Sequence, residues 1–221
     1  MEDFKAPAVP LILQDPYFSI WSFGDRLYED SPRHWTGARN SMVGMVKYDN
    51  KVYRFMGKVS DCSNFYYCEP DIIPQKSMEI KPTGTKYIFE NNEFTLEINF
   101  ISPLLPDDLL LLSRPVSYIT YKITPKKGKT ESSVYFDIAC EASVDKLSQS
   151  VKLERSENGI YCGNTTQNIL GKSGDDIRID WGYLHLLERG GYFGKALQCR
   201  DAFARSRDVE FLTECEEYKI N

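Results

Sequence analysis

Hydrophobic and polar residues alternate along much of the chain from residue 41 onward. The clearest run is residues 94–100, where polar residues separate four apolar ones: Phe94, Leu96, Ile98 and Phe100. Because successive side chains of a strand point to opposite faces, this run predicts a strand with one buried and one solvated face. Tyr87 and Phe89 show the same alternation, and Asn91-Asn92 between the two runs is typical of a hairpin turn.

The same pattern predicts a series of further strands. A second hairpin is expected around Asp49-Asn50, between Val43–Lys47 and Val52–Arg54. Five more runs predict strands: Tyr118–Ile123, Ser133–Cys140, Val151–Glu154, Gly159–Cys162 and a long one at Ile177–Leu187. Only two segments favour helix, and both are short: Asp107–Leu112 and Leu197–Ala204. The chain is therefore predicted to be mainly β, an antiparallel β-sandwich with one or two short helices.

The first forty residues lack both periodicities and are dense in aromatic residues, proline and glycine. Such a segment must bury its rings somewhere. We therefore expect residues 1–40 to form an ordered arm that packs on a sandwich domain of residues 41–221, the two making one structural unit. The last residues, Ile220-Asn221, lie near the place where another strand would be expected. A sandwich truncated at its carboxy terminus is therefore one interpretation of the sequence.

Composition and charge exclude several classes of partner. The net charge is −5, and the densest basic run, Lys126–Lys129, is typical of a solvated hairpin tip, so nucleic acid is not expected. No apolar window is long enough to span a membrane, and the start lacks a signal peptide. These features predict a cytoplasmic protein; the alternative is a secreted or periplasmic one from which a signal has been removed.

Cysteine and histidine usage argues against a metal or cofactor. The six cysteines form no C-x-x-C pair, and the chain has only two histidines, His34 and His185. We expect neither a metal nor a cofactor, and we expect reduced thiols, with disulfides as the alternative. The phosphate-loop, dinucleotide, zinc-protease and serine-hydrolase motifs are missing from the sequence.

Two carboxylate doublets and one loop remain as sources of chemistry. Asp107-Asp108 is interpreted as a helix cap and Asp175-Asp176 as a turn. In the strand expected at Ile177–Leu187, apolar side chains at 179, 181 and 183 should face the core and Asp180 the opposite side. The sequence predicts no catalytic pair.

The most site-like segment is Arg33–Gly37, which combines His34, Trp35 and Thr36 in a loop. Together with Trp21, at the end of the aromatic run Asp15–Trp21, these residues are the candidates for binding a small amide or a sugar ring. The alternative interpretation is structural: the loop buries its indole and the aromatic run packs against the sandwich.

Several motifs of the chain, in the same order, resemble the opening of glutaminase A proteins. They cover nearly the whole sequence: Pro10-Leu11, Asp15–Ser22, His34–Gly37, Tyr53–Gly57, Phe94–Leu96, Ser102–Leu109, Ser113–Tyr118, Gly174–Leu184 and Arg200–Phe203. The resemblance implies an amino-terminal, supersandwich-like β-sandwich, followed in longer proteins by a barrel of paired helices. It also implies hydrolysis of L-glutamine to L-glutamate and ammonia by the whole protein.

The chain matches only the sandwich part of such proteins, so the resemblance implies a non-catalytic domain that supports a carboxy-terminal helical domain. No catalytic residue is carried over to any position of this sequence. Two alternatives stay open. One is a carbohydrate-binding or glycoside-hydrolase-associated sandwich, favoured by the aromatic content of 13%. The other is an interaction module whose uncovered apolar face leads to self-association.

Overall fold

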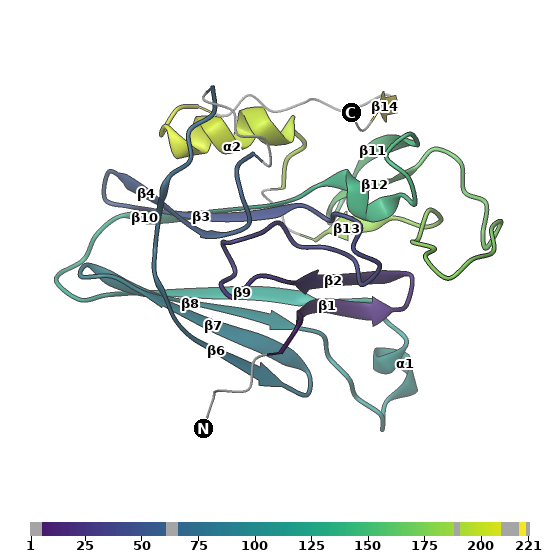
Figure 1. The fold of residues 1–221 in the computed structure, drawn as a ribbon, viewed down its shortest axis with the longest axis horizontal. Coiled ribbons are helices and arrows are strands. Elements are labelled where there is room, and N and C mark those ends of the chain that lie inside the picture. The colour runs from purple at the N-terminus through teal and green to yellow at the C-terminus, as the bar shows by residue number, and fades with distance from the viewer. Residues whose placement is uncertain (1–5, 61–65, 188–190, 209–216, 220–221) are drawn as a thin grey trace.

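The computed structural model describes residues 6–60, 66–187, 191–208 and 217–219. It is mainly β, which confirms the predicted fold class (Figure 1). Two four-stranded sheets stack face to face. The first has the order β10-β3-β4-β5 and comprises β3 (Met42–Tyr48), β4 (Lys51–Met56), β5 (Asp71–Ile72) and β10 (Ser132–Ile138). Adjacent strands of this sheet are antiparallel, except that β4 and β5 are parallel to each other.

The second sheet is antiparallel throughout and has the order β6-β7-β8-β9. Its strands are β6 (Gln75–Lys81), β7 (Gly84–Glu90), β8 (Phe94–Ile101) and β9 (Tyr118–Pro125). The predicted hairpin between β7 and β8 is confirmed. The Asn91 side chain closes its turn by accepting hydrogen bonds from the backbone amides of Glu93 and Phe94, each at 2.9 Å.

Aromatic side chains from both sheets fill the space between them. Phe55 of the first sheet lies 5.7 Å from Phe89 of the second, and Tyr48 stacks on Phe94 at 4.4 Å between ring centroids. The three phenylalanines are fully buried. Each contributes roughly 1.5–3 kcal/mol relative to an exposed side chain. The alternation predicted in β8 is the physical basis of this core.

A third sheet lies beside the sandwich, toward the right of Figure 1, in the order β13-β12-β11-β14. It comprises β11 (Ser150–Ser156), β12 (Gly159–Asn164), β13 (Leu184–Leu186) and β14 (Glu217–Lys219). A short 3-10 helix, η1 (Cys140–Ser143), joins β10 to this region. The sheet has a small core of its own, formed by Val144, Val151, Leu153, Ile160, Cys162 and Phe193.

Both predicted helices are present, as α1 (Leu109–Leu112) and α2 (Ala196–Ala204). Asp108 caps α1 by accepting a hydrogen bond from the Leu111 amide at 2.9 Å, so the cap interpretation of the doublet is confirmed for Asp108. Helix α2 covers the outer face of the first sheet, where Phe203 packs on Tyr135 at 5.1 Å. No helix in the described ranges is long and apolar enough to cross a membrane.

The amino-terminal segment contains a hairpin that the sequence pattern does not reveal. It is formed by β1 (Val9–Asp15) and β2 (Phe18–Ser22), and its register shifts twice along the pair. Such irregularities interrupt the two-residue period, which explains why no strand is predicted there. Leu11 and Ile20 are buried in the main core, so the segment packs on the sandwich.

The long strand predicted at Ile177–Leu187 is wrong. Only Leu184–Leu186 form a strand, and the expected alternation is reversed: Arg178 and Asp180 are buried, while Tyr183 is 52% exposed. Buried charges are stable when partners compensate them, and both residues have such partners. The sequence pattern could not show these partners, because they lie in distant segments.

The cysteines are described only in part. Cys68, Cys140 and Cys162 are free thiols, whereas Cys62 and Cys215 lie outside the described residues. Cys140 in η1 packs against the small core that contains Cys162. The hydroxyl of Ser143 lies 3.6 Å from the Cys162 sulfur and donates to the carbonyl of Cys140 at 2.8 Å.

Candidate functional site

The predicted loop forms a tight turn around a buried histidine. The amide of His34 donates to the carbonyl of Ala38 at 2.7 Å, and the amide of Gly37 donates to the carbonyl of His34 at 2.9 Å. Gly37 has a φ of 87°, which favours glycine at this position. Nδ1 of His34 lies 3.0 Å from the Thr36 hydroxyl. The imidazole is therefore fixed by its own turn and is shielded from solvent.

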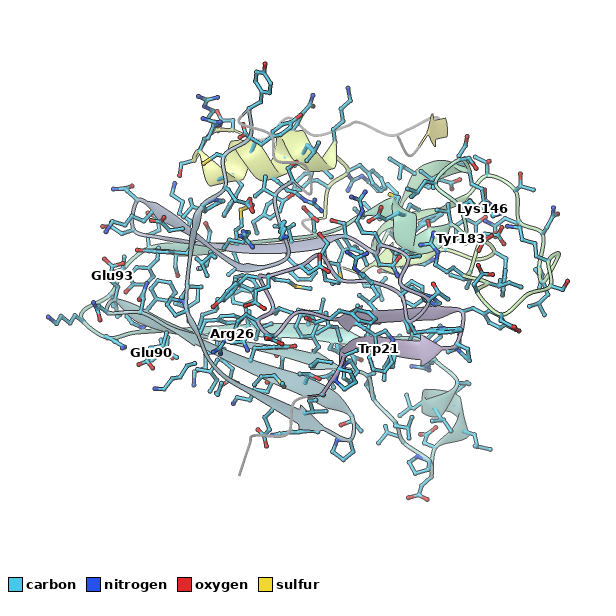
Figure 2. The ribbon with its side chains drawn as sticks, viewed as in Figure 1. Trp21, Arg26, Glu90, Glu93, Lys146 and Tyr183 are labelled. Atoms are coloured by element: carbon cyan, nitrogen blue, oxygen red, sulfur yellow. The ribbon has the colours of Figure 1, made fainter. Side chains whose placement is uncertain are left out.

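The two candidate tryptophans lie close to this turn. Trp21, labelled in Figure 2, belongs to β2 and forms a β-bridge with Arg33, with N–O distances of 2.7 and 2.9 Å. Its indole donates to the Ser19 hydroxyl at 3.0 Å. Trp35 remains 48% exposed although its indole donates to the carbonyl of Pro16 at 2.6 Å. The structure thus brings the four candidate residues into one region, with Trp35 its most exposed member.

Beside this loop lies a buried guanidinium that the sequence pattern did not indicate. Arg178 donates from Nη1 to Oδ1 of Asn40 at 3.2 Å and from Nη2 to the carbonyl of Asp145 at 2.7 Å. Nη1 also lies within hydrogen-bonding distance of the carbonyls of Arg39 and Glu141. Arg178 therefore joins the loop before β3, η1 and the segment that precedes β13.

The carboxylate of Glu141 is the acidic centre of the same region. It is 2% exposed and accepts from the amide of Ser41 at 2.5 Å and from Arg39 at 3.2 Å. A buried carboxylate without such partners would be strongly destabilised. Glu141 is thus a structural anchor for the start of β3.

Lys172 lies between two carboxylates at the edge of this network. Its ammonium is 2.9 Å from Asp145 and 2.6 Å from Asp180, which also accepts from Gln149 at 2.7 Å. Burial alone would raise the pKa of Asp145, but the hydrogen bonds from Lys172 and from the Arg178 amide, together with the positive charges of these two residues, hold that pKa below its ordinary value. Burial likewise opposes the charge on Lys172, yet the two carboxylates raise its pKa.

A small hollow of about 100 Å³ opens beside Lys172 and Asp180. All but one of its lining residues have polar side chains: Gln149, Asn164, Thr166, Asn168, Gly171, Lys172 and Asp180. Amide, hydroxyl and ammonium groups there can hydrogen-bond a small polar group. Because the two charges neutralise each other, the hollow is better suited to recognition than to proton transfer. No cluster of three or more His, Cys, Asp or Glu side chains in the described ranges is placed to hold a metal.

The charged members of this network have no periodic signal in the sequence pattern. Arg178 and Asn40 are 138 residues apart, so no local motif could pair them. Arg178 and Asp180 do fall within the stretch Gly174–Leu184 that carries the family resemblance, but that resemblance assigns them no role. The only local signal was the occurrence of charged residues in an otherwise strand-like run.

The buried imidazole predicts a specific dependence of stability on pH. Burial, followed by the positive charge of Arg178, lowers the pKa of His34 from its ordinary value of 6.5. Between the folded-state pKa and 6.5, the histidine of the unfolded chain binds more protons than the histidine of the folded chain. The free energy of unfolding therefore falls as the pH drops from 6.5 toward the folded-state pKa. We expect His34→Gln to flatten this slope in urea titrations between about pH 7.5 and pH 5.

The exposed His185 provides the matched control, since its ring stacks on Tyr161 near the surface. The variant His185→Gln should keep the wild-type slope. An unchanged slope in His34→Gln would contradict the electrostatic account of the buried imidazole.

The sequence of the chain matches two family models and two relatives. A family model described as a domain of unknown function, DUF4964, matches residues 1–61, and one described as DUF5127 matches residues 83–217. Glutaminase A of Aspergillus oryzae is 28% identical over 152 residues, covering 64% of this chain and 21% of that protein. A protein of Arthroderma benhamiae named "Probable glutaminase" is 23% identical over 244 residues, covering 96% of this chain and 28% of its own length.

These comparisons confirm the resemblance to a glutaminase A-like amino-terminal region. The chain spans about a quarter of the length of these two curated relatives. No solved structure matches the chain.

Proposed function

The chain belongs to the family described as a domain of unknown function, DUF5127, and from this premise we propose that it is the non-catalytic, amino-terminal β-sandwich domain of a glutaminase A-like amidohydrolase. In this proposal the whole protein hydrolyses L-glutamine to L-glutamate and ammonia. The catalytic groups lie in a helical domain outside these 221 residues, which the sandwich supports. The observation that carries the proposal is the match to glutaminase A over 64% of this chain.

The chemistry of the charged network supports an accessory role. The carboxylate of Glu141 accepts hydrogen bonds from Arg39 and the Ser41 amide. The carboxylate of Asp180 pairs with Lys172 and accepts a hydrogen bond from Gln149. A catalytic acid or base must be able to exchange a proton with a substrate. These carboxylates instead bind cations and amides of the same chain, which is the behaviour of groups that fix loops in place.

The decisive experiment compares ammonia release from L-glutamine by the complete gene product and by residues 1–221 alone. We expect release by the complete protein and none by the chain alone. Turnover by the 221-residue chain at roughly 1 per second, a rate typical of enzymes, would overturn the accessory assignment. Asparagine in place of glutamine tests whether any activity is specific for the longer side chain.

A carbohydrate-binding role is the second candidate, favoured by aromatic rings at one surface. Trp35 is 48% and Tyr17 37% exposed, and Tyr17 packs edge-on against Trp181 at 5.2 Å. Exposed rings of this kind can stack on the apolar face of a sugar. Titration calorimetry with a glycan panel tests this role: heat that disappears in Trp35→Ala would support it, and no binding up to millimolar ligand would exclude it.

A further inference from the structure

One loop exposes an unusual number of leucines. Between β8 and β9, six leucines are each more than a third exposed: Leu104, Leu105, Leu109, Leu110, Leu111 and Leu112. They include all four residues of α1, none of which is buried. Single exposed leucines are common, but six within nine consecutive residues are unusual, and exposed apolar groups gathered in this way mark an interaction site. We call residues 104–112 the leucine loop.

The leucine loop is held firmly at its base. The Ser102 hydroxyl accepts from the amide of Leu13 at 3.1 Å and lies 3.1 Å from the hydroxyl of Ser117. Gln14 of β1 donates to the same Ser117 hydroxyl at 2.6 Å. The Asp108 cap fixes the first turn of α1. A partner would therefore meet an ordered surface, and binding would cost little conformational entropy.

The position of the loop indicates a partner that covers one end of the molecule. In Figure 1, α1 projects from the body at the same end as the third sheet and the loop that contains residues 165–176. That second loop also presents apolar side chains, with Ile169 73% and Leu170 58% exposed. Glu93, labelled in Figure 2, lies at the opposite end. One large body placed against this end could cover both loops.

We propose that the leucine loop is the docking surface for the part of the parent polypeptide that lies outside these 221 residues. The inference rests on the proposed function. About three quarters of the length of the two relatives lies outside the matched region. A covalently joined domain is present at a high effective concentration, so even a modest apolar contact would be occupied.

The charges around the loop disfavour a membrane as the occupant. Asp107 and Asp108 are both exposed within the loop, whereas one exposed cation, Arg114, follows it by two residues, and the chain carries a net charge of −5. Surfaces that insert into membranes usually carry lysine or arginine, which are attracted to anionic lipids. A second copy of the chain is also less suited, since a two-fold contact requires a self-complementary surface and α1 is a projection.

The test measures the accessibility of a single cysteine introduced into the loop. Leu110→Cys, at a position that is 66% exposed, is compared between the 221-residue chain and the complete gene product. The matched control is Lys51→Cys, whose lysine side chain is 69% exposed and pairs with Glu93 at the opposite end. Maleimide labelling is followed by mass spectrometry of the peptide that contains the new cysteine, which separates it from the native thiols.

We expect Leu110→Cys to label at least about tenfold more slowly in the complete protein, while Lys51→Cys labels equally in both. Equal rates for Leu110→Cys would overturn the proposal. So would slowing in the 221-residue chain that grows with protein concentration, which indicates a second copy. Slowing of that chain only by phosphatidylcholine–phosphatidylserine vesicles would indicate a membrane and also overturn it.

Ammonia release by the same complete protein separates the two proposals. Activity with equal labelling rates would leave the proposed function intact and remove the docking surface. Protection of Leu110→Cys without activity would support the docking surface and contradict the assignment as part of a glutaminase.

Discussion

Replacing Arg178 by methionine is expected to lower the free energy of unfolding by about 3–5 kcal/mol, because several buried oxygens lose their donor and each such loss costs about 1–3 kcal/mol. Arg178 is 6% exposed, and its guanidinium donates to Asn40 and to the carbonyl of Asp145. Methionine fills much of the same volume but leaves these acceptors without a donor. Urea unfolding monitored by tryptophan fluorescence measures the change.

Two further variants test whether the loss of stability comes from the hydrogen bonds of the buried guanidinium. Arg207→Met removes the same side chain from an exposed position and should change the free energy of unfolding by less than about 0.5 kcal/mol. Arg178→Lys keeps the charge but lacks the planar fork, so it should fall between the wild type and Arg178→Met. Equal stability of Arg178→Met and Arg207→Met would show that the network does not hold the loops together.

The same substitution should change the titration of His34. Because the positive charge of Arg178 contributes to the lowered pKa of His34, removing that charge should raise the pKa toward its ordinary value. Nuclear magnetic resonance of the imidazole protons, recorded against pH in the wild type and in Arg178→Met, would report this. Exposing the imidazole would also raise its pKa, because burial is the larger cause of the lowering. Arg178→Lys, which keeps the charge, is therefore the control that isolates the contribution of charge.

The sandwich itself was predictable because its strands obey a local rule. In β8, Phe94, Leu96 and Phe100 are buried on one face while Glu97 and Asn99 reach the other, so the amphipathic period is visible in the sequence. The hairpin β1–β2 was not predictable in the same way, since its register shifts at two places break the period.

The candidate site could be predicted only in part, for a reason of sequence distance. His34 and Thr36 are two residues apart, and their hydrogen bond follows from one turn. Glu141, by contrast, meets Arg39 across 102 residues. An ion pair between such distant residues has no periodic signature. The pattern around residues 178–180 even predicted the wrong side chains to be buried. Only the folded chain shows which distant charges compensate each other.

Gly57, directly after β4, hydrogen-bonds the amino-terminal segment to the first sheet. Its amide donates to the carbonyl of Leu27 at 3.0 Å, and its own carbonyl accepts from Arg54. The same guanidinium of Arg54 donates to the carbonyl of Tyr28 at 2.8 Å. Gly57 has a φ of 65°, and a Cβ added there would lie 2.0 Å from the carbonyl oxygen of Met42. The backbone conformation and the contact with Met42 therefore explain why glycine stands at the end of the motif Tyr53–Gly57.

Gly57→Ala is accordingly expected to cost about 2–5 kcal/mol, the left-handed backbone and the steric overlap acting together. Gly128→Ala is the matched control, because Gly128 has a φ of 63° but open space around its Cα. That variant should cost only the backbone share, about 1–2 kcal/mol. Urea unfolding of both variants gives the difference, and equal losses would contradict the overlap with Met42. Since the damage is centred where residues 27 and 28 dock, Gly57→Ala should also accelerate tryptic cleavage after Arg26 or Arg33, whereas Gly128→Ala should leave those sites protected.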